Sequence, residues 1–195
     1  MDFTFTEEQS LMADSLRKAY ESDYDFDKRR VFLDDTATFH SPAMWQTLAD
    51  NGFLGLLAPE EVGGFDGGGA EIMAVATEMS RHLALEPFLG TSVMGVRLLV
   101  SSGTDAQKSN ILPKLVAGDA NVAVALYEPG QRYDVVPETT TARVDGDGFV
   151  LNGAKAVVVG CDSARWIAIG AKSEDIGSAV FLLDAGADGV SRKPY

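Results

Sequence analysis

Cysteine and histidine are scarce in this sequence. The 195 residues include one cysteine, Cys161, so an internal disulfide and a cysteine-based metal site are excluded. The two histidines, His40 and His82, lie far apart and lack the spacing of paired metal ligands. No metal-binding residue is therefore predicted, and we interpret Cys161 as a small packing residue with Arg165 as its one nearby cation.

Basic side chains are outnumbered by acidic ones. Lys and Arg total 16 against 29 Asp and Glu, which gives a formal net charge of −13. A nucleic acid or an anionic membrane would be repelled over much of such a surface, so neither is expected as a partner. The charge does not favour an anionic ligand either, unless Arg and Lys side chains cluster locally.

Long apolar runs are also missing. No run approaches the roughly 20 residues that span a membrane, and Met1 to Thr4 has neither the basic start nor the apolar core of a signal peptide. We therefore expect a cytoplasmic protein. Hydrophobic residues make up 46% of the chain, which suffices for the core of one large domain or two small ones.

Helical patterns fill the first 120 residues. Thr6-Glu7-Glu8-Gln9 has the form of a capping box and predicts a helix over 6–20, whereas the mixed charges of 23–30 show no period and predict a solvated turn. Ser41-Pro42 predicts a helix that ends at Gly52. Further helices are predicted over 70–83, over 88–100, and from a second capping box at Thr104 to Gln107 through Pro113, which should kink or split the last of them.

Strand patterns begin near residue 121. The apolar run Val122 to Leu126 ends in Tyr127-Glu128-Pro129-Gly130, which predicts a strand that enters an exposed loop. Two β-rich segments, 139–144 and 149–159, flank Asp145-Gly146-Asp147-Gly148 and predict a hairpin. Two more strands are predicted over 166–171 and 179–184. The predicted fold class is α+β: an N-terminal all-α helical bundle, 1–120, followed by a truncated antiparallel β-domain, 121–195.

Two ordered sets of motifs resemble the acyl-CoA dehydrogenase family. In the helical part they are Leu48-Ala49-Asp50-Asn51-Gly52, Pro59-Glu60-Glu61-Val62-Gly63-Gly64 and Ser80-Arg81; in the β part they are Glu128-Pro129, Asp134, Ala142, Asp147-Gly148, Leu151, Gly153 and Lys155. The glycine-rich loop at 59–69 matches neither known phosphate-binding motif, so a phosphate role is a minor alternative. The family dehydrogenates acyl-CoA thioesters with FAD, so the resemblance implies an acyl-CoA substrate and an oxidoreductase of lipid metabolism.

Compared with the family, the sequence spans about the first half. The later strands and the C-terminal helical domain have no counterpart in it. In the family, the carboxylate that removes the α-proton is held on that C-terminal domain. The resemblance therefore implies no catalytic residue within these 195 positions.

The resemblance also implies where FAD would bind. The cofactor-binding positions that match the family are Leu126, Tyr127, Arg132, Tyr133, Asp134, Val157, Val159 and Gly160. The family has hydroxyl residues at the places of Tyr127, Tyr133 and Val159 and an aromatic residue at that of Val157. Main-chain groups of Leu126, Tyr127 and Gly160 remain able to contact a flavin, but the side-chain half of the site is degenerate, and Arg132 and Tyr133 have a structural role as an alternative.

This pattern is similar to a subset of the family in which two unlike subunits assemble, one of them with an eroded site. Two hypotheses follow. The chain is a subunit of an FAD-dependent acyl-CoA dehydrogenase, inactive alone, in a homo- or hetero-oligomer with a complete subunit; or it is a non-catalytic scaffolding or regulatory partner built on the same fold. Lys155 is interpreted as a solvated charge at a strand edge.

Overall fold

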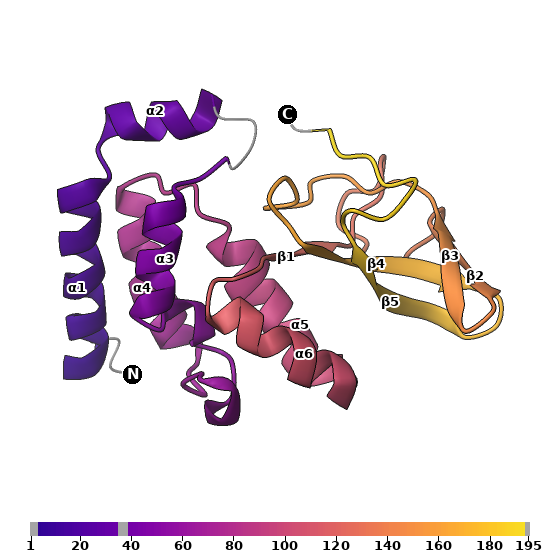
Figure 1. Cartoon of the computed structure of the whole chain (residues 1–195), viewed down its shortest axis with the longest axis horizontal. Helices are drawn as coiled ribbons and strands as arrows, with labels where there is room; N and C mark the ends of the chain where they lie inside the picture. Colours follow the sequence, from indigo (N-terminus) through magenta and orange to yellow (C-terminus); the bar gives the residue numbers. More distant parts are fainter. Residues whose placement is uncertain (1–3, 35–38, 194–195) are drawn as a thin grey trace. The chain divides into compact units, whose positions relative to one another are not determined.

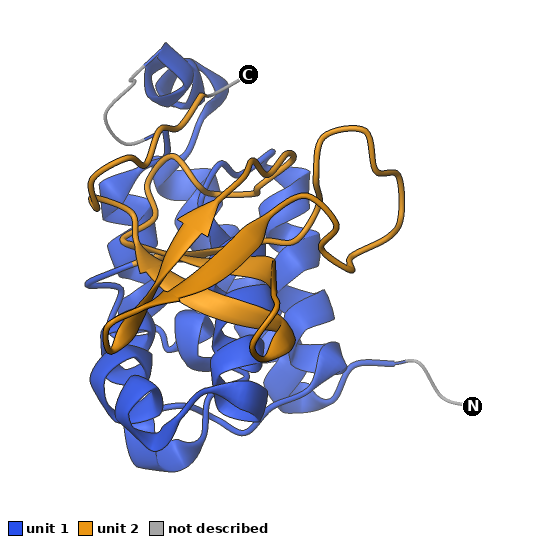
Figure 2. Ribbon diagram, turned by 90° about the vertical axis from the view of Figure 1, so that its right-hand side faces the viewer, with its two compact units in different colours: residues 1–120 blue, residues 121–195 orange. Residues whose placement is uncertain are grey.

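The computed structural model describes residues 4–34 and 39–193, and the chain divides into two compact units, Met1–Ala120 and Asn121–Tyr195 (Figure 2). The first unit is helical and the second contains a β-sheet, which confirms the α+β fold class. Residues 1–3, which bear on the signal-peptide prediction, lie outside the described residues. None of the described helices has both the length and the apolar character needed to cross a membrane.

The helical unit follows the predicted order closely (Figure 1). Its elements are α1 (Glu7–Asp23), α2 (Phe26–Asp34), α3 (Pro42–Asp50), η1 (Phe53–Gly55), η2 (Glu60–Val62), α4 (Gly69–Arg81), η3 (Leu89–Gly95), α5 (Val96–Ser102) and α6 (Asp105–Val116). Side-chain caps fix several helix starts. The Thr6 hydroxyl accepts a hydrogen bond from the Gln9 N–H at 3.2 Å, and Gln9 Oε1 accepts one from the Thr6 N–H at 3.0 Å. The same reciprocal box opens α6, and the Ser41 hydroxyl caps α3.

Three helix predictions need correction. Residues 23–30 are not a turn, because α2 begins at Phe26 and Asp25 Oδ1 accepts the Lys28 N–H at 2.8 Å, which caps the helix. No residue of α2 is buried, so the helix has no apolar period to detect. The segment 88–100 is not α-helical throughout, since η3 is a π-helix that precedes α5. Pro113 does not split α6, because the helix continues through it to Val116 and the Pro113 carbonyl accepts the Ala117 N–H at 3.0 Å.

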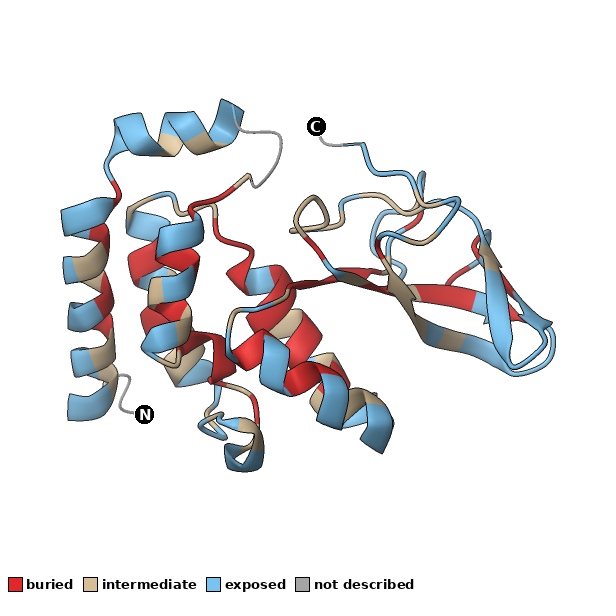
Figure 3. Cartoon of the chain, viewed as in Figure 1, coloured by how far each residue is buried: buried red, intermediate tan, exposed pale blue. Residues whose placement is uncertain are grey.

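The core of the helical unit lies between α1, α3, α4 and the short η1 (Figure 3). Its fully buried side chains include Leu16, Tyr20, Leu48, Leu54 and Val75. A salt bridge also joins α1 to α4, because Nε and Nη2 of Arg17 donate to the buried carboxylate of Glu78 at 3.0 and 2.9 Å. The glycine-rich loop belongs to this packing: a Cβ at Gly64 would lie 2.0 Å from the carbonyl oxygen of Ala58, so these glycines allow close approach of the main chain.

The second unit holds a mixed sheet of β1 (Val122–Ala125), β2 (Thr141–Asp145), β3 (Gly148–Asn152), β4 (Trp166–Ser173) and β5 (Gly177–Asp184). The β2–β3 hairpin is confirmed, and β4–β5 is a second antiparallel hairpin. However, β1 pairs with β4 in parallel, and β2 meets β4 in parallel at one residue pair. The sheet is therefore not purely antiparallel, because the long connection from β1 to β4 permits a parallel crossover.

The predicted second hairpin strand ends early. β3 ends at Asn152 rather than at residue 159. The next residue, Gly153, has φ +151°, and a Cβ placed on it would lie 2.7 Å from the Cα of Thr140. The chain thus leaves the sheet at Gly153, and residues 154–160 form an irregular segment.

A small apolar core supports the sheet. Ala123, Ala125 and Ile167 pack with Ala164 and Ala185, and Cys161 lies against this cluster, as interpreted. The cation near the thiol is Arg192, not Arg165. Arg192 Nη1 donates to the carbonyl oxygens of Cys161 and Asp162 at 3.0 Å, and burial raises the pKa of the Cys161 thiol.

Candidate functional site

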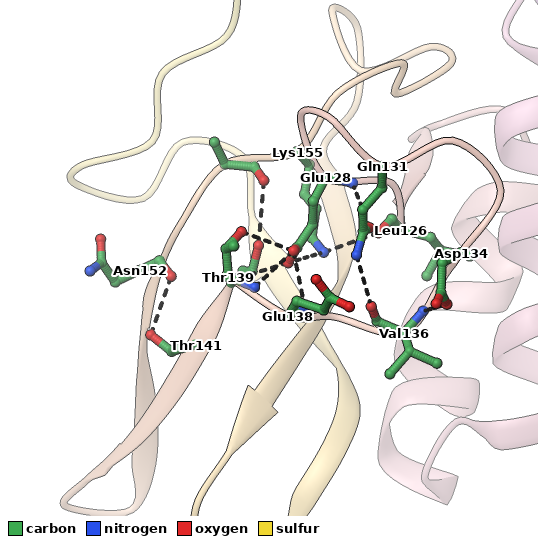
Figure 4. Close-up of polar contacts among 12 residues, drawn as sticks. Leu126, Glu128, Gln131, Asp134, Val136, Glu138, Thr139, Thr141, Asn152 and Lys155 are labelled. Carbon is green, nitrogen blue, oxygen red and sulfur yellow. Dashed lines mark hydrogen bonds and ion pairs between the residues drawn. The ribbon is translucent and has the colours of Figure 1, made fainter.

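The carboxylate of Glu128 is the centre of a buried polar network just after β1 (Figure 4). Its side chain is 1% exposed, although it carries a formal charge. Five donors surround it: the N–H of Glu138 (3.1 Å), the N–H and hydroxyl of Thr139 (both 2.8 Å), the N–H of Thr140 (2.7 Å) and the ammonium of Lys155 (3.2 Å). A carboxylate that accepts this many bonds is satisfied despite its burial.

These donors decide the charge state of Glu128. Burial by itself raises the pKa of a carboxyl, but the hydrogen bonds from Thr139 and Thr140 outweigh burial and hold the pKa of Glu128 well below its usual range. Glu128 is therefore ionised at neutral pH. Lys155 Nζ supplies the opposite charge at 3.2 Å, so the pair is a buried salt bridge.

Lys155 is not a solvated charge, and that interpretation is wrong. Its side chain is 6% exposed, and Nζ also donates to the carbonyl oxygen of Leu126 at 3.0 Å. One ammonium thus joins the segment after β3 to the segment after β1. The sequence does show a lone lysine within an apolar run, but the partner lies 27 positions away, so the pairing depends on the tertiary fold.

The loop between β1 and β2 is held from within. Gln131 Oε1 accepts the N–H of Glu128 at 3.3 Å, and its Nε2 donates to the carbonyl of Val136 at 3.2 Å (Figure 4). Asp134 Oδ1 accepts the Val136 N–H at 2.9 Å, which makes Asp134 a turn residue of the loop. Tyr133 is 89% exposed and Arg132 is exposed as well. Arg132, Tyr133 and Asp134 thus lie on the exposed surface of this loop.

The other implied residues lie on two adjacent segments. The Ala156 N–H donates to the carbonyl of Tyr127 at 2.9 Å, which aligns residues 126–128 with 154–157. Val157 has φ +53°, a left-handed conformation that is strained for a β-branched residue. The exposed fractions are 38% for Tyr127, 63% for Val157 and 45% for Val159. Two hydrogen-bonded segments thus present apolar side chains at their surface.

A flavin ring requires contact with its faces and hydrogen-bond donors at its polar edge, because reduction places negative charge on the ring. Val157 and Val159 offer apolar contact only. Among the side chains of Leu126, Tyr127, Val157 and Val159, the tyrosine hydroxyl is the one donor. The carbonyl groups of Leu126 and Tyr127 already accept hydrogen bonds from Lys155 Nζ and the Ala156 N–H, and the side chains do not fit a complete flavin site.

The described residues contain no group of three or more His, Cys, Asp or Glu that could hold a metal ion. The site is therefore built around an ion pair, an ordered loop and an exposed apolar strip. Such an arrangement holds the main chain of the loop in place. Glu128 is enclosed by hydrogen-bond donors that lower its pKa, so its carboxylate is a poor proton acceptor.

Comparison with known proteins agrees with this architecture. FadE12 of Mycobacterium tuberculosis, an acyl-CoA dehydrogenase, is 31% identical over 206 residues, which cover 99% of this chain and 51% of FadE12. The 3-(aryl)acrylate reductase of Clostridium sporogenes is 31% identical over 194 residues, 96% of this chain and 50% of that protein. The crystal structure of the ChsE4-ChsE5 complex from M. tuberculosis is similar with a TM-score of 0.85 and 28% identity, over 98% of this chain and 50% of the matched one.

The chain thus spans about half the length of the curated relatives it matches. The family model for the acyl-CoA dehydrogenase N-terminal domain matches residues 6–119, more than half of the sequence. That match, together with the helical unit and the sheet that follows it, shows that the chain belongs to the acyl-CoA dehydrogenase family.

Proposed function

We propose that this chain is an acyl-CoA dehydrogenase-like flavoprotein subunit that functions with a complete subunit rather than alone. The reaction of that assembly is the α,β-dehydrogenation of an acyl-CoA thioester with FAD, which is the reaction of the family. The similarity to one chain of the two-component ChsE4-ChsE5 complex supports a hetero-oligomer. The degenerate positions Tyr127, Val157 and Val159 support dependence on a partner.

One observation carries the proposal. The chain keeps the buried Glu128–Lys155 pair that orders the loop, but it lacks the flavin-contacting side chains that the family has at the positions of Tyr127, Val157 and Val159. Glu128 and Lys155 remain buried and hydrogen-bonded to each other, and Lys155 also fixes the main chain of Leu126. A buried ion pair is costly to maintain unless its hydrogen bonds are all made, so the loop architecture is strongly constrained. The exposed side chains of Val157 and Val159 beside it supply no donor to a ring. A subunit that keeps the fold and leaves the chemistry to its partner has these properties.

The same observation also supports the second candidate, a non-catalytic scaffolding or regulatory partner on this fold. The two candidates differ in what the complex does. A dehydrogenase subunit changes the turnover or the acyl selectivity of the complete subunit. A scaffold forms the complex and leaves both unchanged.

The test is co-expression of this chain, carrying the only affinity tag, with a full-length acyl-CoA dehydrogenase subunit. Flavin absorbance and acyl-CoA-dependent reduction of a dye are measured for the chain alone, the complete subunit alone and the captured complex, on straight, branched and ring-bearing acyl groups. We expect no turnover by the chain alone and a complex whose rate or selectivity differs from that of the complete subunit. A complex with unchanged kinetics favours the scaffold, and turnover by the chain alone contradicts the proposal.

A further inference from the structure

The carboxyl group of Glu86 lies where three parts of the helical unit meet. Glu86 is buried in the connection between α4 and η3. The hydroxyl of Tyr20 on α1 donates to its Oε2 at 3.1 Å, and the N–H of Ser41, the N-cap of α3, donates to its Oε1 at 3.3 Å. One carboxyl group thus holds α1, the start of α3 and this connection together.

These contacts suit a neutral acid better than an anion. None of the ion pairs formed within residues 4–34 and 39–193 includes Glu86, whereas the buried Glu128 has five donors, one of them a lysine. A buried carboxylate without a countercharge is costly. Burial therefore raises the pKa of Glu86, although the main-chain N–H groups of residues 85 and 86 also favour its ionised form.

The titratable groups around Glu86 belong to several elements. Tyr20 and Tyr24 of α1 have ring centroids 5.1 Å apart, and burial raises the pKa of both, so they stay protonated at neutral pH. His82, which follows α4, stacks on Tyr20 with ring centroids 5.3 Å apart. His40, which precedes α3, is buried as well. A positive charge on either histidine favours the glutamate anion, so histidine protonation at low pH opposes protonation of Glu86.

The connection that carries Glu86 is strained. Leu83 has φ +51° two residues after α4, at a place where a helix end usually has glycine, and its side chain is exposed. Arg29 of α2 donates to the Leu83 carbonyl at 2.7 Å, and the Leu85 N–H donates to the Tyr24 hydroxyl at 3.0 Å. Beside this turn is a cleft of about 370 Å³, which is lined in part by Tyr20, Tyr24, His82 and Leu83. Opening of the turn therefore relieves strain and lets water from the cleft reach Glu86.

We propose that Glu86 is a proton-dependent latch. As a neutral acid it holds the connection at 82–88 and the start of α3 against α1, and its ionisation releases both by local opening of this end of the helical unit. The main chain continues from Glu86 into the buried Phe88 and η3, so opening loosens the start of that π-helix. The latch depends neither on the flavin site nor on a partner chain.

The sign of the pH dependence follows from the raised pKa. In the closed state Glu86 stays neutral above about pH 4.3, the pKa of a glutamate in water, whereas in the open state it ionises there. The equilibrium constant for opening should therefore rise with pH, by at most about tenfold per pH unit, until Glu86 is ionised in the closed state as well. A contact held by an ionised carboxylate would open as pH falls instead.

The test is hydrogen exchange of the full chain, followed by NMR from about pH 4.5 to about pH 8 and corrected for the intrinsic exchange rate. The reporters are the amides of Ser41, Leu85 and Phe88, which donate to Glu86 Oε1, the Tyr24 hydroxyl and the Glu86 carbonyl. We expect their opening constants to rise with pH. The opening should have a free energy below that of global unfolding and depend little on urea, because it is local.

Matched variants assign the proton to one residue. E86Q should remove the pH dependence, whereas E21Q, at an exposed glutamate of the same cleft, and H82Q should not. Circular dichroism at each pH checks that the chain stays folded. Opening constants that are flat with pH in the wild-type chain, a slope that survives in E86Q or is lost in E21Q or H82Q, or reporters that exchange only by global unfolding would each overturn the proposal.

Discussion

Glu128 and Lys155 form a buried ion pair, with Oε1 and Nζ 3.2 Å apart, between the segment that leaves β1 and the segment that follows β3. The lysine also holds the carbonyl of Leu126, and the glutamate holds three consecutive residues ahead of β2. The loop around the site is therefore organised by one pair of opposite charges.

Substitution of the pair should be costly. E128Q keeps the shape but leaves the ammonium of Lys155 buried without its countercharge and places an amide NH₂ among donors, so we expect a loss of about 3–5 kcal/mol of unfolding free energy. K155M should cost less, because Glu128 keeps four other hydrogen bonds. Urea denaturation measures both. E138Q, an exposed acid in the same loop, is the control and should change stability by less than about 0.5 kcal/mol.

The pH dependence of the same variants has a defined sign. The pKa of Glu128 is lowered in the folded state, so its contribution is complete above the pKa of an unfolded glutamate, about 4.3, and declines as pH falls further. The stability gap between wild type and E128Q should thus shrink between about pH 5 and pH 3. A constant gap over that range would show that the charge of Glu128 does not stabilise the fold.

Glu86 should behave in the opposite way. It is 6% exposed, and burial raises its pKa although Tyr20 donates to it at 3.1 Å and the Ser41 N–H at 3.3 Å. A raised pKa means that the folded state favours the neutral acid, so the penalty of ionisation grows as pH rises above the unfolded value. We expect E86Q to be more stable than wild type at pH 7, by on the order of 1 kcal/mol, and equal to it near pH 4. Thermal unfolding across pH measures this, and an E86Q that is less stable at pH 7 would contradict it.

Local signals made much of the fold predictable. The caps at Thr6, Ser41 and Thr104 involve residues three positions apart, so they can be read directly from the sequence. The β2–β3 hairpin is equally local, because glycines mark its turn. What these elements share is that the residues that decide the structure are neighbours in the chain.

The errors have a common physical origin in contacts that the sequence does not display. α2 packs no fully buried side chain, so hydrophobic periodicity carries no information about it. The parallel β1–β4 pairing and the burial of Lys155 both depend on segments that meet only in the folded chain. Lysine is usually exposed, so Lys155 was predicted to lie at the surface. It is buried because it pairs with the carboxylate of Glu128, which lies 27 positions away in the sequence.

Val157 offers a test of backbone strain beside the site. Its φ of +53° is unfavourable for a β-branched residue, and the side chain is 63% exposed, so little packing is lost on truncation. We expect V157G to stabilise the chain by about 1 kcal/mol. V159G, at a 45% exposed valine whose φ is not positive, should destabilise it by a similar amount. Equal effects of the two glycines on the urea midpoint would show that Val157 is not strained.

The flavin site can be tested by restoring what it lacks. The wild-type chain should purify without colour and bind added FAD weakly, because the Thr or Ser hydroxyls that the family has at the positions of Tyr127 and Val159, and the aromatic residue that it has at the position of Val157, are replaced. Two hydrogen bonds at roughly 1 kcal/mol each and a ring contact of similar size amount to about 3 kcal/mol, or about a hundredfold in affinity. The triple variant Y127T, V157W and V159T should therefore bind FAD about a hundredfold more tightly, as measured by quenching of flavin fluorescence.

The control for that experiment is V144T, which adds a hydroxyl at a 44% exposed valine of β2 outside the site and should leave FAD affinity unchanged. Because the Glu128–Lys155 pair already aligns the main chain of residues 126–128 and 154–157, the three side chains alone should recover most of the gain. If E128Q is added to the triple variant, the gain should fall, since the donors are then no longer held in place. Stoichiometric FAD on the wild-type chain, or a triple variant no tighter than V144T, would show that these positions do not govern flavin binding.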